Sequence, residues 1–111
     1  MNESILTSIK KMLGITSEYQ HFDPDIIMHI NTVLMILTQI GVGPSKGFSI
    51  SDDTATWNQF TDSKNVEAIK SYVALKVRLL FDPPSGTANI ESIERLIKEL
   101  EWRINIAAES T

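Results

Sequence analysis

The stretch from Asn65 to Asp82 constrains the fold most, because apolar residues occupy well over half of its helical circumference. Two adjacent rows follow the helical repeat: Val66, Ile69, Val73, Val77 and Leu80, and beside them Ala68, Tyr72, Leu75 and Leu79. A helix that is apolar on so many sides needs neighbours on several of them. We therefore predict that this segment is the central helix of the chain.

The residues after this helix predict a sharp end. Pro83 and Pro84 lack a backbone N–H, and Pro83 also disfavours a helical conformation at Asp82. Ser85 and Gly86 then allow the chain to reverse its direction. We expect a helical hairpin between the central helix and the segment that follows.

The last helix is predicted to run from about Asn89 to Ala108. Its apolar residues recur at alternating intervals of three and four, as in a heptad seam. The seam residues are Ile90, Ile93, Ile97, Leu100, Ile104 and Ala107. Three Glu-first pairs at a spacing of four each support the helix by about 0.2 to 0.5 kcal/mol. These pairs are Glu91–Arg95, Glu94–Lys98 and Glu99–Arg103. The seam is expected to pack against the central helix.

A short first helix is predicted near the N-terminus. Its apolar residues at helical spacing are Ile5, Ile9, Met12 and Leu13. Asn2 or Ser4 is available as the N-cap, and Gly14 suits a left-handed residue at the end. We expect a polar connector from Ile15 to Phe22 after it.

The second helix is predicted to start at Asp23 and to stop at Gly41. Asp23 is suited to cap it, Pro24 suits the first helical position, and Asp25 faces the positive end of the dipole. Its main apolar stripe comprises Ile26, Ile30, Val33, Leu37 and Ile40. Met28, Met35 and Ile36 lie off this stripe. They belong either to the core, where Met fills irregular gaps, or to a second contact face used by another subunit.

The segment from Val42 to Ser63 is predicted to be a long irregular loop. Phe48-Ser49-Ile50 is a candidate short strand, and Asp53-Thr54 a candidate cap for one helical turn with Trp57 and Phe60. A loop of this length is either functional or disordered, and its aromatic residues argue for order. The aromatic residues either tuck onto the core or anchor a partner.

Composition bounds the class of protein. The 111 residues are predicted to form one all-α domain over residues 1–111, a small bundle of about four helices. A net charge of −4 argues against a partner held through many phosphate contacts. The chain has no cysteine, which excludes disulfides and thiolate sites. The first residues lack the apolar core of a signal peptide and no stretch is expected to span a bilayer, so we expect a cytoplasmic product without a membrane partner.

No motif predicts catalysis, a metal or a cofactor. Of His21, Asp23, Asp25 and His29, only Asp25 and His29 have a helical spacing that aims two ligands at one point. The Gly41–Gly47 segment follows a helix and precedes none directly, so it does not have the context of a phosphate loop. Asp52-Asp53 sits in a polar loop that offers no means of raising a carboxyl pKa. Neither the second nor the last helix presents the basic face of a DNA reader. By elimination, the chain is predicted to be a binding or assembly module and not an enzyme.

The order of these features resembles the small head-tail connector proteins of long-tailed bacteriophages. The most specific parts are YVALKVRLLFDPP, from Tyr72 to Pro84, and LEWRINI, from Leu100 to Ile106. The resemblance implies an all-helical adaptor that forms a ring of its own copies under the portal protein. It also implies a bridge to a downstream head-closure or tail-completion protein. Such a protein is assembled in the bacterial cytoplasm and resides in the virion at the head-tail interface.

The same resemblance implies a central channel through which genomic DNA passes without sequence-specific binding. An acidic lumen repels phosphates and lets DNA slide, so the net charge fits. A closed ring is heterologous and needs two different contact faces on each subunit. The residues proposed for one face are Met28, Met35, Ile36 and Trp57.

Two groups of residues match the motifs of the family. Arg78, Phe81, Asp82 and Pro83 match its helix-ending motif and are interpreted as architectural: Phe81 packs, Pro83 stops the helix, and Arg78 pairs with Asp82. Trp102 and Arg103 match its C-terminal motif and are candidate portal contacts; alternatively, Trp102 simply flanks the apolar seam. The alternative function is that of a small cytoplasmic regulatory or host-interaction protein of similar helical build.

Overall fold

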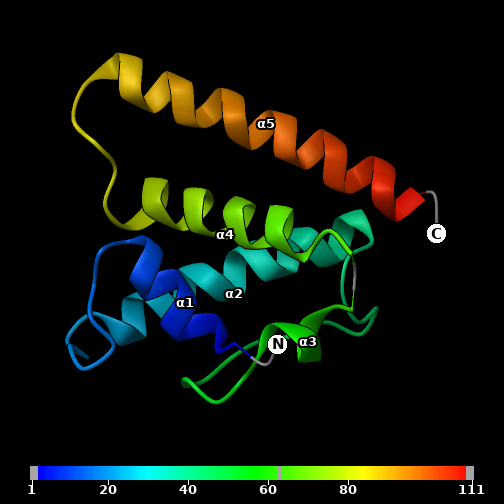
Figure 1. Cartoon of the computed structure of the whole chain (residues 1–111), viewed down its shortest axis with the longest axis horizontal. Coiled ribbons are helices and arrows are strands. Elements are labelled where there is room, and N and C mark those ends of the chain that lie inside the picture. The colour runs from blue at the N-terminus through cyan, green and yellow to red at the C-terminus, as the bar shows by residue number, and fades with distance from the viewer. Residues whose placement is uncertain (1–2, 63, 110–111) are drawn as a thin grey trace.

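The computed structural model describes residues 3–62 and 64–109, and these form five α-helices and no β-strand. The helices are α1 (Ile5–Met12), α2 (Asp23–Ile40), α3 (Trp57–Phe60), α4 (Val66–Phe81) and α5 (Thr87–Glu109). Figure 1 shows α5 as an outer layer above α4, with α1, α2 and α3 on the other side of α4. The all-α prediction is confirmed.

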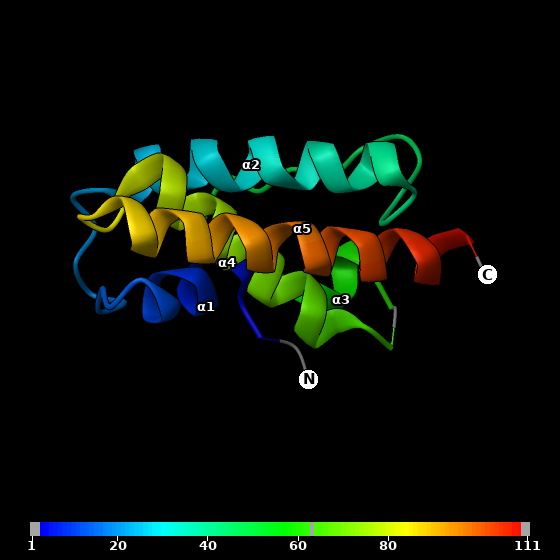
Figure 2. The same cartoon turned by 90° about the horizontal axis from the view of Figure 1, so that it is seen from above.

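The central position of α4 is also confirmed. It contacts α1, α2 and α5, and seen from above, α1 and α2 lie on its two flanks (Figure 2). Tyr72, Val73 and Val77 are completely buried. Leu80, which the apolar row placed beside them, is exposed because it lies in the last turn, beyond most of the packing.

The first helix begins and ends as its sequence predicts. The Ser4 hydroxyl oxygen accepts a hydrogen bond from the backbone N–H of Thr7 at 3.1 Å, so Ser4 is the N-cap. Gly14 has a φ of 82°, which a residue with a side chain rarely adopts. Asn2, the alternative cap, lies outside the described residues.

Helix α2 starts differently from the prediction. Phe22 occupies the N-cap position and makes no side-chain capping bond, while Asp23 belongs to the first turn. The Asp23 carboxylate instead pairs with Lys10 of α1 at 2.8 Å. A buried ammonium needs a counter-charge more than the helix needs a cap, which explains the difference. The predicted end is confirmed, because Gly41 is left-handed with a φ of 110°.

The long loop contains no strand among its described residues, which end at Asp62; Ser63 lies outside them. Ile50 is fixed by the Asn31 side chain on α2, which accepts from its N–H at 2.8 Å and donates to its carbonyl at 3.0 Å. This side-chain clamp takes the place of the predicted strand at Phe48–Ile50.

The helical turn in this loop is capped later than predicted. Thr56, and not Asp53 or Thr54, is the N-cap of α3, and its backbone N–H donates to the Gln59 side chain at 3.1 Å. Thr56 also forms an isolated antiparallel bridge with Ser4. The loop is therefore attached to the start of the chain as well as to α2.

The predicted hairpin between α4 and α5 forms. Ile97 and Ile104 of the seam are buried, and the Tyr72 hydroxyl donates to the Glu101 carboxylate at 2.7 Å. Of the three predicted Glu-first pairs, Glu99–Arg103 forms at 2.9 Å. Over the part of the chain that the structure describes, the other two do not form, and Arg95 donates to Ser92 instead.

Candidate interaction surfaces

The outward side of α2 is exposed, and beyond the first turn of the helix it carries no charge. Met28 and Met35, seven residues apart, are 57% and 53% exposed, and Thr32 and Gln39 are exposed between and after them. From residue 26 to residue 45 the chain has no Asp, Glu, Lys or Arg. We call Met28, Thr32, Met35 and Gln39 the α2 outer face. Depletion of charge and enrichment in Met are typical of the buried centre of a protein interface.

A shallow groove of about 450 Å³ borders the α2 outer face. Met35 and Gln39 line one side of it, and the loop from Lys46 to Ser49 lines the other. Lys46 is exposed and, among the described residues, is the one charged residue of the lining. The Asn31 clamp on Ile50 keeps this loop against α2 and thus maintains the groove.

The other residues predicted for this interface lie elsewhere. Ile36 is half-buried on a different side of α2, because it follows Met35 by one residue. Trp57 is 2% exposed, and its indole N–H donates to the Ser8 hydroxyl of α1 at 2.8 Å. Trp57 is therefore a core residue, and its side chain is not available to a neighbouring subunit.

The outward side of α5 has a different character. Trp102 is 62% exposed, and Ile106, one helical turn later, is also exposed. Trp102 precedes buried Ile104 by two residues and so points away from the seam. This exposure argues against the interpretation that Trp102 flanks the seam. Arg103 is exposed and pairs with Glu99.

The motif at the end of α4 is built around the Phe81 ring. It packs edge-on against Phe22, with ring centroids 5.3 Å apart, and lies 6.4 Å from His29. The predicted Arg78–Asp82 ion pair does not form among the described residues; the backbone N–H of Asp82 donates to the Arg78 carbonyl instead. Helix α4 ends one residue before Asp82.

The loop from Ile15 to Phe22 is held by one buried side chain. Lys10 is 2% exposed, and its ammonium donates to the carbonyls of Tyr19 at 2.7 Å and Ser17 at 3.2 Å while it pairs with Asp23. Sequence reasoning missed this role, since Lys10 and exposed Lys11 look alike in the sequence. The one available signal was a Lys on the same side of α1 as Leu6, which precedes it by four residues.

The histidine and aspartate side chains near the start of α2 have surroundings other than a metal site. Asp23 pairs with Lys10, His21 lies against Tyr19 and Phe22, and His29 lies against Phe81. Within residues 3–62 and 64–109, no group of three His, Asp or Glu side chains is arranged to hold a metal ion. In the same residues, no helix combines the length and apolar character needed to cross a membrane.

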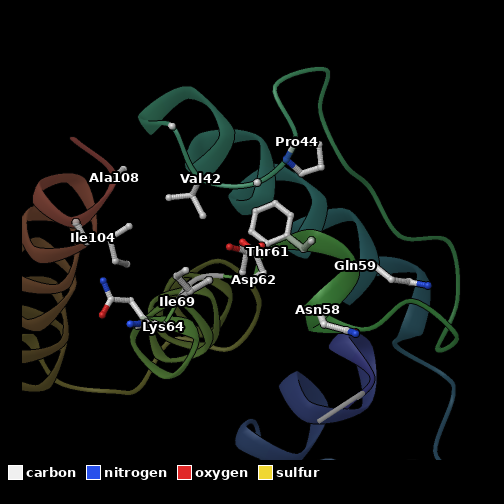
Figure 3. Close-up of a pocket in the computed structure, with 15 residues that line it drawn as sticks. Val42, Pro44, Asn58, Gln59, Thr61, Asp62, Lys64, Ile69, Ile104 and Ala108 are labelled. Atoms are coloured by element: carbon white, nitrogen blue, oxygen red, sulfur yellow. The ribbon is translucent and has the colours of Figure 1, made fainter. Parts of the chain in front are cut away.

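A cavity of about 830 Å³ opens between the end of α2, α3, the start of α4 and the end of α5. Figure 3 shows Val42, Ile69 and Ile104 around it, with Asp62 and Lys64 from the segment before α4. Gly43 is required in its wall, because a Cβ there would come 2.5 Å from the Phe60 ring.

A small helical subunit with two exposed, chemically distinct helix faces has the surface of an assembly protein. Residues 5–111 match the family model described as phage connector protein. The chain therefore belongs to the phage connector protein family. Proteins of this family are structural components of the virion that associate with its head and tail proteins. No curated protein and no solved structure matches the chain.

Proposed function

We propose that this chain is the head-tail adaptor of a tailed phage or prophage. Its copies form a ring under the portal protein and link the DNA-filled head to a downstream head-closure or tail-completion protein. The match of residues 5–111 to phage connector proteins is the observation that carries this proposal. The protein is assembled in the bacterial cytoplasm and acts in the virion.

The α2 outer face supports the ring. A ring interface buries one surface of each subunit against a different surface of the next. Met28 and Met35 supply flexible apolar contacts, and the helix carries no charged residue between them. We therefore assign the α2 outer face to one side of the subunit contact, with Ile36 at its margin and without Trp57.

The α5 face supports attachment to the portal. Trp102 offers a large exposed ring, and its position is fixed because α5 continues beyond it to Glu109. Arg103, the next residue, offers a planar cation. Trp and Arg are the residue types that most often dominate binding energy in interfaces. The charged residues around them fit the polar rim of such a contact.

The negative net charge supports a channel through which DNA slides. With 14 acidic against 10 basic residues, a ring of many copies accumulates negative charge. This charge repels phosphates and leaves no basic groove to retain the duplex. DNA would therefore pass without sequence-specific binding.

Analytical sedimentation of the chain, alone and mixed with the portal protein encoded beside it, tests the proposal. We expect co-sedimentation as one large complex with several copies of the chain per portal. Serum albumin in place of the portal protein is the control for non-specific association. A folded chain that ignores the portal at every salt concentration would overturn the proposed function.

A further inference from the structure

Four rings gather on the surface at the end of the molecule where α2 begins. The ring centroids of Tyr19 and His21 lie 5.8 Å and 4.8 Å from that of Phe22, and Phe22 packs against Phe81. Tyr19, His21 and Phe22 are exposed. We call Tyr19, His21, Phe22 and Phe81 the aromatic platform. Exposed aromatic residues that pack together and extend to a partly buried ring are typical of a contact surface.

The aromatic platform is rigid because Lys10 holds its loop. The Lys10 ammonium donates to the carbonyls of Ser17 and Tyr19 and forms an ion pair with the Asp23 carboxylate. The loop has few apolar residues to fix its path, so this buried cation determines where Tyr19 and Phe22 lie. A surface that is ordered before binding loses less conformational entropy when a partner docks.

The charges around the aromatic platform are mainly negative. Exposed Glu18, Asp25 and Asp82 adjoin its rings in the sequence or on the first turn of α2, and half-buried Arg78 lies one turn before Phe81 on α4. The groove that borders the α2 outer face has the opposite sign, since Lys46 is the one charged residue among the described residues that line it. The two surfaces are therefore complementary in charge.

Resting on the proposed ring, we propose that the aromatic platform of one subunit docks on the α2 outer face of the next copy, beside Lys46. Tyr19 and Phe22 would lie against Met35, a favourable pairing of rings with thioether sulfur. The platform lies where α2 begins and the Lys46 loop where α2 ends, so the platform and the part of the α2 outer face beside Lys46 are at opposite ends of this helix (Figure 2). A contact between two such different surfaces is heterologous and can close into a ring.

Two variants on exposed residues test this contact, each with one surface disabled. Tyr19→Asp disables the aromatic platform, and Met35→Asp disables the α2 outer face. In sedimentation equilibrium, each variant alone should self-associate roughly tenfold or more weakly than the unmodified chain. An equimolar mixture should form dimers and nothing larger, because it retains one intact pair of surfaces. Asn58→Asp on α3 adds the same charge to an exposed position elsewhere and should assemble normally.

Circular dichroism melts first establish that each variant is folded. Self-association of Tyr19→Asp equal to that of the unmodified chain would overturn the inference. So would a Tyr19→Asp variant that still pairs while Met35→Asp does not, since that result indicates α2 packing on α2. An unmodified chain that stays monomeric at its highest soluble concentration also overturns it. Portal binding is scored separately, so full co-sedimentation of both variants with the portal would leave the proposed function standing.

A crosslink gives a second, independent measurement. The chain has no cysteine, so single variants Tyr19→Cys and Gln39→Cys each introduce the one thiol present. Under mild oxidation, the docking contact predicts a disulfide-linked dimer in the mixture in excess over either variant alone. Equal crosslinking in all three samples would contradict the proposed contact.

Discussion

The outer faces of α2 and α5 are both exposed, yet they differ in the density of charge and in how each helix is attached. Helix α2 buries Ile26, Ile30, Val33, Leu34 and Leu37, whereas α5 buries only Ile97 and Ile104. The α2 outer face has no charge, while the exposed positions of α5 carry, besides Trp102, the charged residues Glu91, Glu94, Arg95, Lys98, Glu99 and Arg103. The comparison indicates that α2 is part of the core and that its outer face is suited to the centre of an interface. Helix α5 is less tightly packed, and its main candidate contact residue is Trp102.

Truncation of a buried side chain on each helix tests the difference in packing and has the largest expected effect. Leu34→Ala in α2 should lower the free energy of unfolding by about 4 kcal/mol, and Ile97→Ala in α5 by about 2 kcal/mol. Leu34 is completely enclosed, while the site of Ile97 at the margin of the core can collapse more easily. Urea denaturation followed by circular dichroism measures both. Equal losses would contradict the view that α5 is lightly packed.

The sequence predicted α4 and α5 well because their signals are local. Each signal lies within a short stretch of sequence: the helix end at Asp82-Pro83-Pro84, the reversal at Gly86 and the alternating seam of α5. The tertiary contacts do not override these local preferences. The off-stripe position of Met28 and Met35 was also visible, although the choice between core and contact face was not. The exposure of Met28 and Met35 decides whether they are core or contact residues, and it depends on which sides of α2 are covered by α1 and α4.

The sequence did not predict the contacts that join distant segments. Trp57 donates a hydrogen bond to Ser8, which is 49 residues earlier in the sequence. Asn31 is hydrogen-bonded to Ile50, which is 19 residues later. Asp23 has an intrinsic preference for the N-cap, but pairing with buried Lys10 prevails because an unpaired buried cation costs more than a missing cap. The helical periodicity also predicted that Leu80 is buried, whereas it is exposed. The pattern shows which side of a helix is apolar but not where the helix extends beyond the elements that cover it.

The tie between α1 and α2, made by Lys10 and Asp23, is expected to be stronger than the tie between α4 and α5, made by Tyr72 and Glu101. Lys10→Met should lower the free energy of unfolding by about 3 kcal/mol, because it leaves Asp23 and the Tyr19 carbonyl without their partner. Lys11→Met, at the exposed neighbouring position, should change it by less than about 0.5 kcal/mol. Thermal and urea unfolding of the pair measures the difference. Similar values for both would show that the Lys10 ammonium does not hold the loop.

The role of Trp102 on α5 is tested by measuring portal binding, because the free energy of unfolding should hardly change. Trp102→Ala should weaken attachment to the portal protein roughly tenfold or more, while the free energy of unfolding changes by less than about 0.5 kcal/mol. Leu96→Ala removes an exposed apolar residue from another side of the same helix and serves as the matched control. Titration of the portal with each variant in a sedimentation assay gives the affinities. Loss of stability without a selective loss of binding would return Trp102 to a purely structural role.

The tie between α4 and α5 has the smallest expected effect and is the most sharply testable through pH. Tyr72→Phe removes the hydrogen bond to Glu101 and should cost about 1 kcal/mol near neutral pH, since half-buried Glu101 can turn to water. Burial and then the bond to Glu101 raise the pKa of the Tyr72 hydroxyl above its ordinary value of 10.0. The folded chain therefore retains this proton at a pH where the unfolded chain releases it.

The sign of the pH effect follows from proton binding. Above about pH 10 the unfolded state binds fewer protons than the folded state, so the stability that Tyr72 contributes is present below pH 10 and declines as pH rises further. Glu3 raises the pKa of Lys70 as well, but that contribution is the same in both variants. The free energy of unfolding should thus fall more steeply above pH 10 in the unmodified chain than in Tyr72→Phe. Parallel curves in urea titrations between pH 7 and pH 11 would mean that the α4–α5 tie is not made through a protonated, buried tyrosine.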